Sequence, residues 1–242
     1  MTGQVASLDV FPHRTEWGAP VTSEPAQVHP VIRDFYEHTD RYELVVRPTW
    51  FRPFRRAGRL FSWFARRFLG NLELPTGNTE PDVVRTRLFA IDDPLDPRMD
   101  VRAYVRTYVN AAGERANYVA AYSTHTGPTG TLLSAAFPLP FCTLVGALRF
   151  EWLQAGGVCL KSCPRLEQGV QQAPQDEGMF LVTPLGVVRL PVEERILVLP
   201  NPVSGGLVAH HRVRVFGRPA FSLEYSILRL ELGAGDLPNR TG

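Results

Sequence analysis

Hydrophobic and polar residues follow two different spacings along this chain. From about residue 83 onward, apolar and polar positions alternate with a period of two, which is typical of β-strands with one buried face. A separate strand is expected over residues 42–50. The later expected strands cover residues 83–91, 99–110, 115–125, 131–139, 146–153, 157–162, 178–184, 186–191, 195–200, 208–217 and 220–232. Because they follow one another without helical crossovers, the sheet should be antiparallel.

The beginning of the chain shows helical spacing instead. Pro30 suits the first position of a helix over residues 29–42, and Pro53 suits the start of a second helix, over residues 53–70. We therefore expect a mainly β (α+β) fold, a curved antiparallel sheet or half-barrel with the two N-terminal helices packed on or in its concave face. Residues 1–26 read as a flexible lead-in, 27–233 as a single β-rich domain and 234–242 as a flexible tail.

The helix predicted at residues 53–70 is amphipathic. Its apolar arc holds Phe54, Ala57, Leu60, Phe61, Phe64, Ala65 and Phe68. The other side carries Arg55, Arg56, Arg59, Arg66 and Arg67, with Trp63 among them. No acidic residue occurs between Leu44 and Leu72. Such a helix could cover an apolar cavity or lie on an anionic membrane surface. A core-packed helix with its arginines in water would show the same apolar face.

Two expected strands carry arginine on one face. Arg102, Tyr104, Arg106 and Tyr108 share one side of the strand over residues 99–110. Arg212 and Arg214 share a side of the strand over residues 208–217, while His211 lies on the opposite side. If the two strands are neighbours, these residues would form a basic, aromatic surface for an anionic ligand. The solvated outside of an antiparallel sheet has the same appearance.

Composition sets limits on partners and location. The formal net charge of +2 gives no field that would drive the chain onto nucleic acid, so no nucleic-acid partner is expected. The opening residues lack the pattern of a secretory signal, and the cysteine count of three is odd. We expect reduced thiols and a cytoplasmic location.

The chain carries no recognisable catalytic motif. No metal-ligand spacing, GxSxG elbow or phosphate-binding glycine loop occurs, so neither a metal nor a cofactor is expected. Asp34 and His38 share a helical face, but they supply too few ligands for a metal site. Glu193 and Glu194, followed by Arg195, read as a solvated turn more readily than as an acid–base pair.

Both ends of the chain resemble a known but uncharacterised bacterial family. HPVIRDFYEHTDRYEL, with the arginine-rich helix after it, is similar to the opening of the soluble C-terminal part of YndJ-type membrane proteins. GVVRLPVEERILVLP and LVAHHRVRVFGRPAFSLEYSI are similar to that family's ending. The second stretch also has the cadence of a domain appended to some bacterial saccharopine-dehydrogenase-like proteins. The resemblance implies a stand-alone bacterial domain of unknown function, and it assigns no functional residue. If the chain is a separate version of a domain found beside membrane spans, the resemblance also favours work near a membrane.

The sequence favours a non-catalytic domain that binds an apolar or amphipathic anionic ligand such as a lipid or acyl compound, with helix 53–70 as lid or inner wall. An alternative is a module that docks its arginine-rich helix on an acidic protein or a membrane surface. A third is an enzyme with an acid or base in a cavity. The candidate ligand-binding residues are Arg55, Arg59, Trp63, Arg66, Arg102, Tyr104, Arg106, Arg212 and Arg214.

Overall fold

The computed structural model describes residues 28–52, 54–56, 58, 82–91, 101–110, 113–127, 130–153, 156–162 and 176–230. An α-helix, α1 (Pro30–Glu37), and a 3₁₀ turn (Thr39–Arg41) precede the strands. The strands are β1 (Tyr42–Trp50), β2 (Asp82–Ala90), β3 (Arg102–Asn110), β4 (Gly113–Gly127), β5 (Gly130–Leu139), β6 (Cys142–Trp152), β7 (Val158–Ser162), β8 (Gly178–Thr183), β9 (Gly186–Leu190), β10 (Val192–Pro200), β11 (Leu207–Val215) and β12 (Arg218–Arg229). Each predicted strand is present, with shifted bounds for most.

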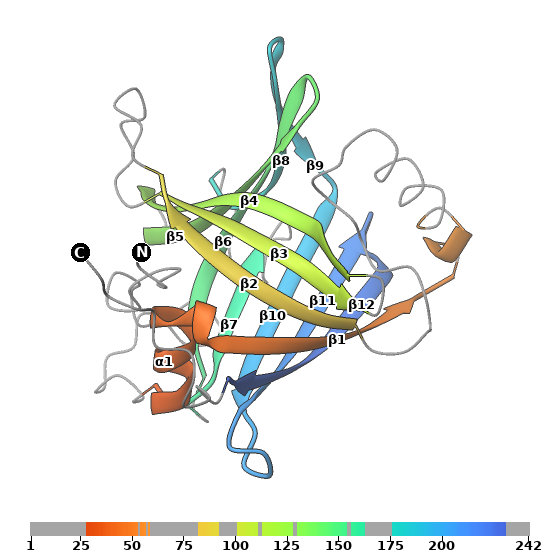
Figure 1. Ribbon diagram of the computed structural model, residues 1–242. Helices are drawn as coiled ribbons and strands as arrows, with labels where there is room; N and C mark the ends of the chain where they lie inside the picture. The colour runs from red at the N-terminus through yellow and green to blue at the C-terminus, as the bar shows by residue number, and fades with distance from the viewer. Residues whose placement is uncertain are drawn as a thin grey trace, which may run out of the picture.

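Ten of these strands form a closed antiparallel barrel, seen from the side in Figure 1. β1 to β7 and then β10 to β12 lie in chain order, and β12 returns to pair with β1. That seam runs from Tyr42 opposite Arg229 to Trp50 opposite Phe221. The expected open sheet or half-barrel is therefore wrong. Alternation along a strand predicts which residues share a face, but it does not reveal whether the two sheet edges meet.

β8 and β9 stand outside this ring as a hairpin. β6 pairs along one edge with β5, and its other edge is shared by β7 near Trp152 and by β8 near Thr143. The hairpin consequently projects from one end of the barrel, at the top of Figure 1. We call this end the arm end, and the opposite end, next to α1, the helix end.

α1 closes the helix end. Ile32, Phe35 and Tyr36 are buried on the face that meets the strands. The backbone N–H of His29 donates to the carbonyl of Gly156 in the β6–β7 turn at 3.0 Å, which fixes the start of the helix against the barrel. The predicted first helix is confirmed over a shorter length, because a 3₁₀ turn follows at Thr39.

The described residues of the second predicted helix do not lie on the concave side of the sheet. Residues 54–56 and 58 are helical and follow the arm end of β1, where Gly58 packs so closely on Trp50 that a Cβ would overlap the indole. Arg55 is exposed, and no described residue of this segment lines the barrel interior. The inward faces of ten strands already surround that space, so the expectation of two helices inside the sheet is wrong. Residues 59–70 lie outside the described residues.

Aromatic side chains from α1, β1 and β6 pack together at the helix end of the interior. Tyr36 meets Phe150 edge-on with ring centroids 5.4 Å apart, and Phe35 meets Tyr42 in the same way at 5.3 Å. Ile32 and Phe150 are fully inaccessible to solvent. Burial of such side chains contributes roughly 1.5–3 kcal/mol each to the stability of the fold. This plug leaves the middle and the arm end of the barrel as the place for a cavity.

Candidate functional site

A cavity of about 450 Å³ lies inside the barrel. It is lined by α1 and by residues from all ten barrel strands, and it extends to Phe137 and Val215 near the arm end. Barrels of eight strands are just wide enough to be filled by their own side chains or to hold one small ligand, and the diameter grows with strand number. A ten-stranded barrel therefore has room for a ligand, and the volume falls within the usual range of ligand sites.

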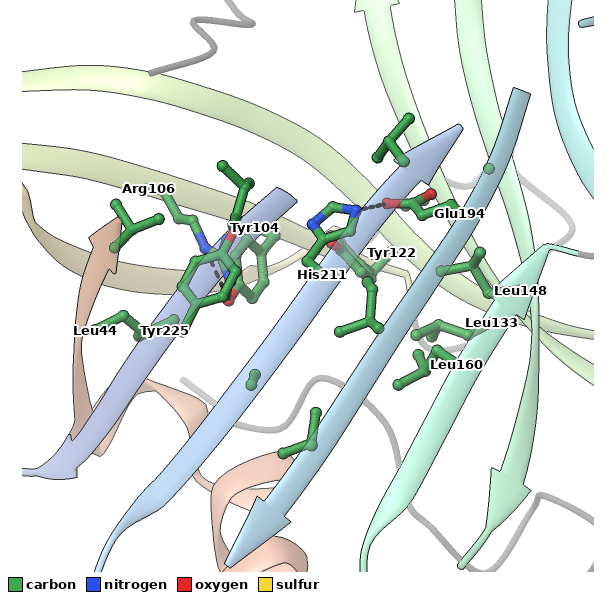
Figure 2. A pocket seen from close by; sticks show the side chains of 18 of the residues that line it. Leu44, Tyr104, Arg106, Tyr122, Leu133, Leu148, Leu160, Glu194, His211 and Tyr225 are labelled. Carbon is green, nitrogen blue, oxygen red and sulfur yellow. Dashed lines mark hydrogen bonds and ion pairs between the residues drawn. The ribbon is translucent and has the colours of Figure 1, made fainter. Parts of the chain in front are cut away.

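Most of the lining is apolar, and apart from Tyr36 and Thr39 its polar side chains form two groups. Figure 2 shows both, with leucines such as Leu44, Leu133 and Leu148 around them. One group is Arg106 with three tyrosines. The other is His211 with Glu194. A small number of polar groups in an apolar pocket is the usual composition of a site that orients an amphipathic molecule.

Arg106 lies among aromatic rings. Its guanidinium donates to the Tyr104 hydroxyl, with Nη2 at 2.9 Å and Nε at 3.2 Å. The Arg106 Cζ lies 5.0 Å from the centroid of the Tyr104 ring and 5.7 Å from that of Tyr225, which reaches across from β12 (Figure 2). Tyr122 packs against Tyr104 with centroids 4.9 Å apart. Contacts of this kind stabilise a buried cation and fix its orientation.

The protonation states of Arg106 and the nearby tyrosines make this part of the cavity a source of hydrogen-bond donors. Burial raises the pKa of Tyr225 above its usual value although Arg106 beside it acts in the opposite direction. Burial also raises the pKa of Tyr36, deeper in the cavity. Both hydroxyls therefore remain protonated at neutral pH, and the guanidinium remains charged. Together they offer O–H and N–H donors to an anion that enters the cavity.

His211 and Glu194 form the second polar group. The His211 Nε2 atom lies 2.7 Å from Glu194 Oε1, and the two residues come from the adjacent strands β11 and β10 (Figure 2). The Ser162 hydroxyl accepts the backbone N–H of Glu194 at 2.8 Å, which links this position to β7. An imidazole held by a carboxylate can serve as a general base or acid. Among the described residues that line the cavity there is no serine or cysteine to act as a nucleophile.

The sequence-predicted site residues are distributed over three places. Tyr104 and Arg106 line the cavity, and Arg102 lies two residues before Tyr104 on the same strand. Arg212 and Arg214 lie on the outer wall, in a hollow of about 470 Å³. β3 pairs with β2 and β4, and β11 pairs with β10 and β12, so the two arginine-bearing strands are not neighbours.

The remaining site predictions concern the second helix. Arg55 is exposed near the arm end of β1. Arg59, Trp63 and Arg66 lie outside the described residues.

Sequence reasoning missed Glu194 and Tyr225. Glu194 was assigned to a solvated turn, but it lies inside β10 on the face shared by Val192, Ile196 and Val198. A single carboxylate that interrupts an apolar face was the available signal. His211 likewise shares its face with valines, whereas the neighbouring His210 lines the outer hollow.

A buried ionic cluster lies on the opposite side of the β6–β7 wall. Lys161 Nζ is 2.8 Å from Glu151 Oε1, and Arg149 Nε is 3.4 Å from the same oxygen and 3.7 Å from Glu177 Oε2. Burial raises the pKa of the neighbouring Cys159 thiol, although Arg195 opposes this effect. The carboxylates are paired with cations and the thiol is not activated, so the cluster is best explained as part of the fold.

Comparison with known proteins places the chain beside one curated relative. It is 29% identical over 208 residues to the uncharacterized membrane protein YndJ of Bacillus subtilis (strain 168), a match that covers 85% of this chain and 36% of that protein. The resemblance predicted from the two ends is confirmed: the chain is a distant homologue of YndJ and spans little more than a third of its length. The chain matches no protein-family model, and no solved structure is similar to it. Within the described residues, no helix has both the length and the hydropathy required to cross a bilayer.

Proposed function

We propose, for this distant homologue of a protein that is itself uncharacterised, a function drawn from its cavity. The chain binds an amphipathic molecule with an acyl-like apolar part and an anionic headgroup, and it holds that molecule inside the barrel. The apolar part contacts the leucine and valine side chains of the wall. The headgroup binds Arg106 and the tyrosine hydroxyls beside it.

One observation carries the proposal: a guanidinium and several tyrosine hydroxyls line a largely apolar cavity of about 450 Å³. Placing a charged group in such a space costs free energy unless hydrogen bonds and ring contacts compensate it. Tyr104 and Tyr225 supply part of that compensation. A bound carboxylate or phosphate would supply a further part, through the bidentate contacts that arginine makes with such groups.

A second candidate is an enzyme that uses His211 and Glu194 as an acid–base pair. The 2.7 Å contact between them inside the cavity favours it. A hydrolase of this kind would activate a water molecule, because no nucleophilic hydroxyl of a serine or thiol of a cysteine lines the described cavity. Turnover of acyl esters by the purified chain, and its loss in the His211→Gln variant, would support this candidate.

The first test compares two arginines on opposite sides of the wall. Arg106→Gln removes the cation inside the cavity, and Arg212→Gln makes the same change on the outer surface. A charge-assisted hydrogen bond contributes about 1.5–3 kcal/mol, so Arg106→Gln should weaken the binding of a long-chain fatty acid about 10- to 100-fold. Arg212→Gln should leave it unchanged. Displacement of a fluorescent fatty acid measures both.

A matched pair of ligands keeps this test independent of folding. The wild-type chain should bind a fatty acid more tightly than the fatty alcohol of the same length, because only the acid is anionic. Circular dichroism establishes that Arg106→Gln is folded, and in that variant the preference for the acid should vanish. Native mass spectrometry of freshly purified protein supplies the direct check for a retained small molecule. If the wild type binds neither acid nor alcohol, the proposal is wrong.

The name of the relative adds a location to this proposal. YndJ is called a membrane protein, so a homologous domain that takes up an amphipathic molecule would have its ligand at hand in a bilayer. We therefore propose that the domain works near a membrane, and not in the free cytoplasm that the sequence predicts.

A further inference from the structure

The arm end has a protein surface that lies outside the cavity. It is built from residues 137–147, which are the arm-end part of the β5–β6 hairpin, and from residues 178–190, which form the β8–β9 hairpin paired to it. We call these two segments the arm. In Figure 1 their tips stand side by side beyond the barrel, at the top of the view. Thr143 pairs with Val182 across the two hairpins, so the arm is one continuous piece of sheet.

The arm is almost uncharged, and its tips are strongly exposed. Arg189 is the one charged residue in its two segments, although 21% of the whole chain is charged. Phe141 is 93% exposed and Leu185 is 100% exposed at the two tips. Val187 and Val188 are 65% and 56% exposed, and as neighbours on a strand they point to opposite faces. A hairpin in water normally has one polar face, whereas this one is apolar on both.

Exposed arginines lie at the arm end of the barrel, after β1 and at the start of β12. The Phe51 N–H donates to the Ala220 carbonyl at 3.0 Å, which places the residues after β1 beside the start of β12. Four exposed residues of these two segments form what we call the basic rim: Arg52, Arg55, Arg56 and Arg218. Phe216, in the adjacent β11–β12 turn, is 77% exposed. No acidic residue occurs within 47–58 or 213–222.

The apolar lining of the cavity continues onto the arm. Phe137, Leu144 and Met179 line the cavity and also belong to the base of the arm. Leu144 pairs with Leu181, and Leu181 pairs with Val188, so this row of side chains runs from the cavity wall to the exposed hairpin. An acyl chain could therefore pass between the cavity and the arm without losing contact with apolar surface.

We propose that the arm and the basic rim dock on an anionic lipid surface. Phe141 and Leu185 enter the region between headgroups and acyl chains, and the rim arginines bind lipid phosphates. Apolar tips beside cations are the combination that peripheral proteins use at such surfaces. Docking in this orientation would turn the arm end of the cavity toward the lipid. Only that last consequence rests on the proposed function.

The experiment is flotation of the full chain with vesicles. Vesicles that contain phosphatidylglycerol should carry the protein at low salt, and pure phosphatidylcholine vesicles should carry much less. The double variant Phe141→Ser/Leu185→Ser should bind at least tenfold more weakly, because the buried apolar area is lost. Val203→Ser is the matched control: Val203 is 95% exposed, but in the β10–β11 turn at the helix end. That control should float like the wild type.

A second pair of variants tests the charge. Arg55→Gln/Arg218→Gln should weaken binding to anionic vesicles and reduce its dependence on salt. Arg41→Gln/Arg212→Gln removes the same charge from exposed positions outside the rim and should have little effect. Absence of wild-type flotation at low salt would overturn the proposal, and so would unchanged flotation of the tip variant. Self-association through the arm, detected by sedimentation and abolished in the tip variant without any vesicle binding, would overturn it in favour of a second copy.

Ligand binding separates this result from the proposed function. In vesicle-free solution the tip variant should retain the wild-type affinity for a fatty acid, because neither substituted residue lines the cavity. Flotation without fatty-acid binding would leave the docking surface standing and refute the cavity ligand. Fatty-acid binding without flotation would do the reverse.

Discussion

Arg106 and Tyr225 meet across the barrel although β3 and β12 are separated by β2 and β1. A guanidinium is hydrated more weakly than an ammonium group, and its flat face stacks on aromatic rings. Lysine at position 106 would keep the charge but lose both the ring stacking and the double contact with the Tyr104 hydroxyl. Arginine at this position is therefore specific, and the conservative change to lysine should not preserve recognition of an anion.

Asp34 joins α1 to the seam of the barrel. The Tyr42 hydroxyl donates to Asp34 Oδ2 at 2.5 Å, Arg229 Nη1 lies 3.6 Å from the same oxygen, and His38 Nδ1 lies 3.1 Å from Oδ1. Partial burial alone would raise the pKa of Asp34, but the Tyr42 hydrogen bond and the charges of Arg229 and His38 lower it below its usual value. A carboxyl group with a lowered pKa stabilises the fold above its unfolded-state pKa of about 4, and this stabilisation is lost as the pH falls through the folded-state value.

Asp34→Asn should thus destabilise the protein by about 1 kcal/mol at pH 7. The difference from the wild type should shrink at strongly acidic pH, as the pH falls through the lowered folded-state pKa and Asp34 itself becomes protonated. Urea unfolding at several pH values measures this difference. Asp40→Asn is the control, since Asp40 is exposed in the next turn. Equal destabilisation by Asp34→Asn at neutral and at strongly acidic pH would show that the charge of Asp34 is unimportant.

The residue patterns predicted which residues share a face of a strand, but not whether that face points into the barrel or out of it. In β3 the alternation grouped Tyr104 with Arg106, and both line the cavity. In β11 it grouped Arg212 with Arg214 in the same way, and both lie outside. Nothing local distinguishes the two cases, because inside and outside exist only after ten strands have closed. Tyr225 was not predicted as a site residue, because its partner Arg106 is remote in the sequence.

At the scale of elements, α1 closes one end of the cavity, whereas the sequence pattern predicts such a covering role for the helix over residues 53–70. A short helix with three buried residues, Ile32, Phe35 and Tyr36, closes the barrel. Its small size concealed this role, because the longer arginine-rich segment has the more pronounced apolar arc. Amphipathicity predicts that a helix has a buried face, but it does not identify the surface that receives it.

Ile32→Ala tests the importance of this closure. Ile32 is fully inaccessible to solvent, and truncation of such a side chain costs about 2–5 kcal/mol of unfolding free energy. Val31→Ala, on the half-buried side of the same helix, should cost about 1 kcal/mol or less. Chemical denaturation of both variants provides the comparison. A loss below about 1 kcal/mol for Ile32→Ala would mean that the barrel does not depend on its helical end.

For the whole molecule, the strands and their order along the chain were accessible from the sequence, whereas closure and the cavity were not. A period of two is a local property, and each hairpin joins neighbouring segments. The pairing of Tyr42 with Arg229 and the pairing of β7 with β10, which the projecting hairpin separates only along the chain, are long-range features. They depend on how the whole sheet twists and curls, which cannot be predicted from any short stretch of the sequence.

The chain order of the barrel has a consequence for folding kinetics. Most strand pairings in the barrel join strands that are consecutive in the chain. The two exceptions are the pairing of β7 with β10 and the β1–β12 seam. Loop-closure entropy opposes the pairing at the seam most strongly, so it should form last. Leu44→Ala or Ile227→Ala in the seam should then mainly accelerate unfolding, whereas Leu133→Ala or Leu148→Ala in the β5–β6 hairpin should mainly slow folding. Stopped-flow chevron plots would reveal the order in which this barrel closes.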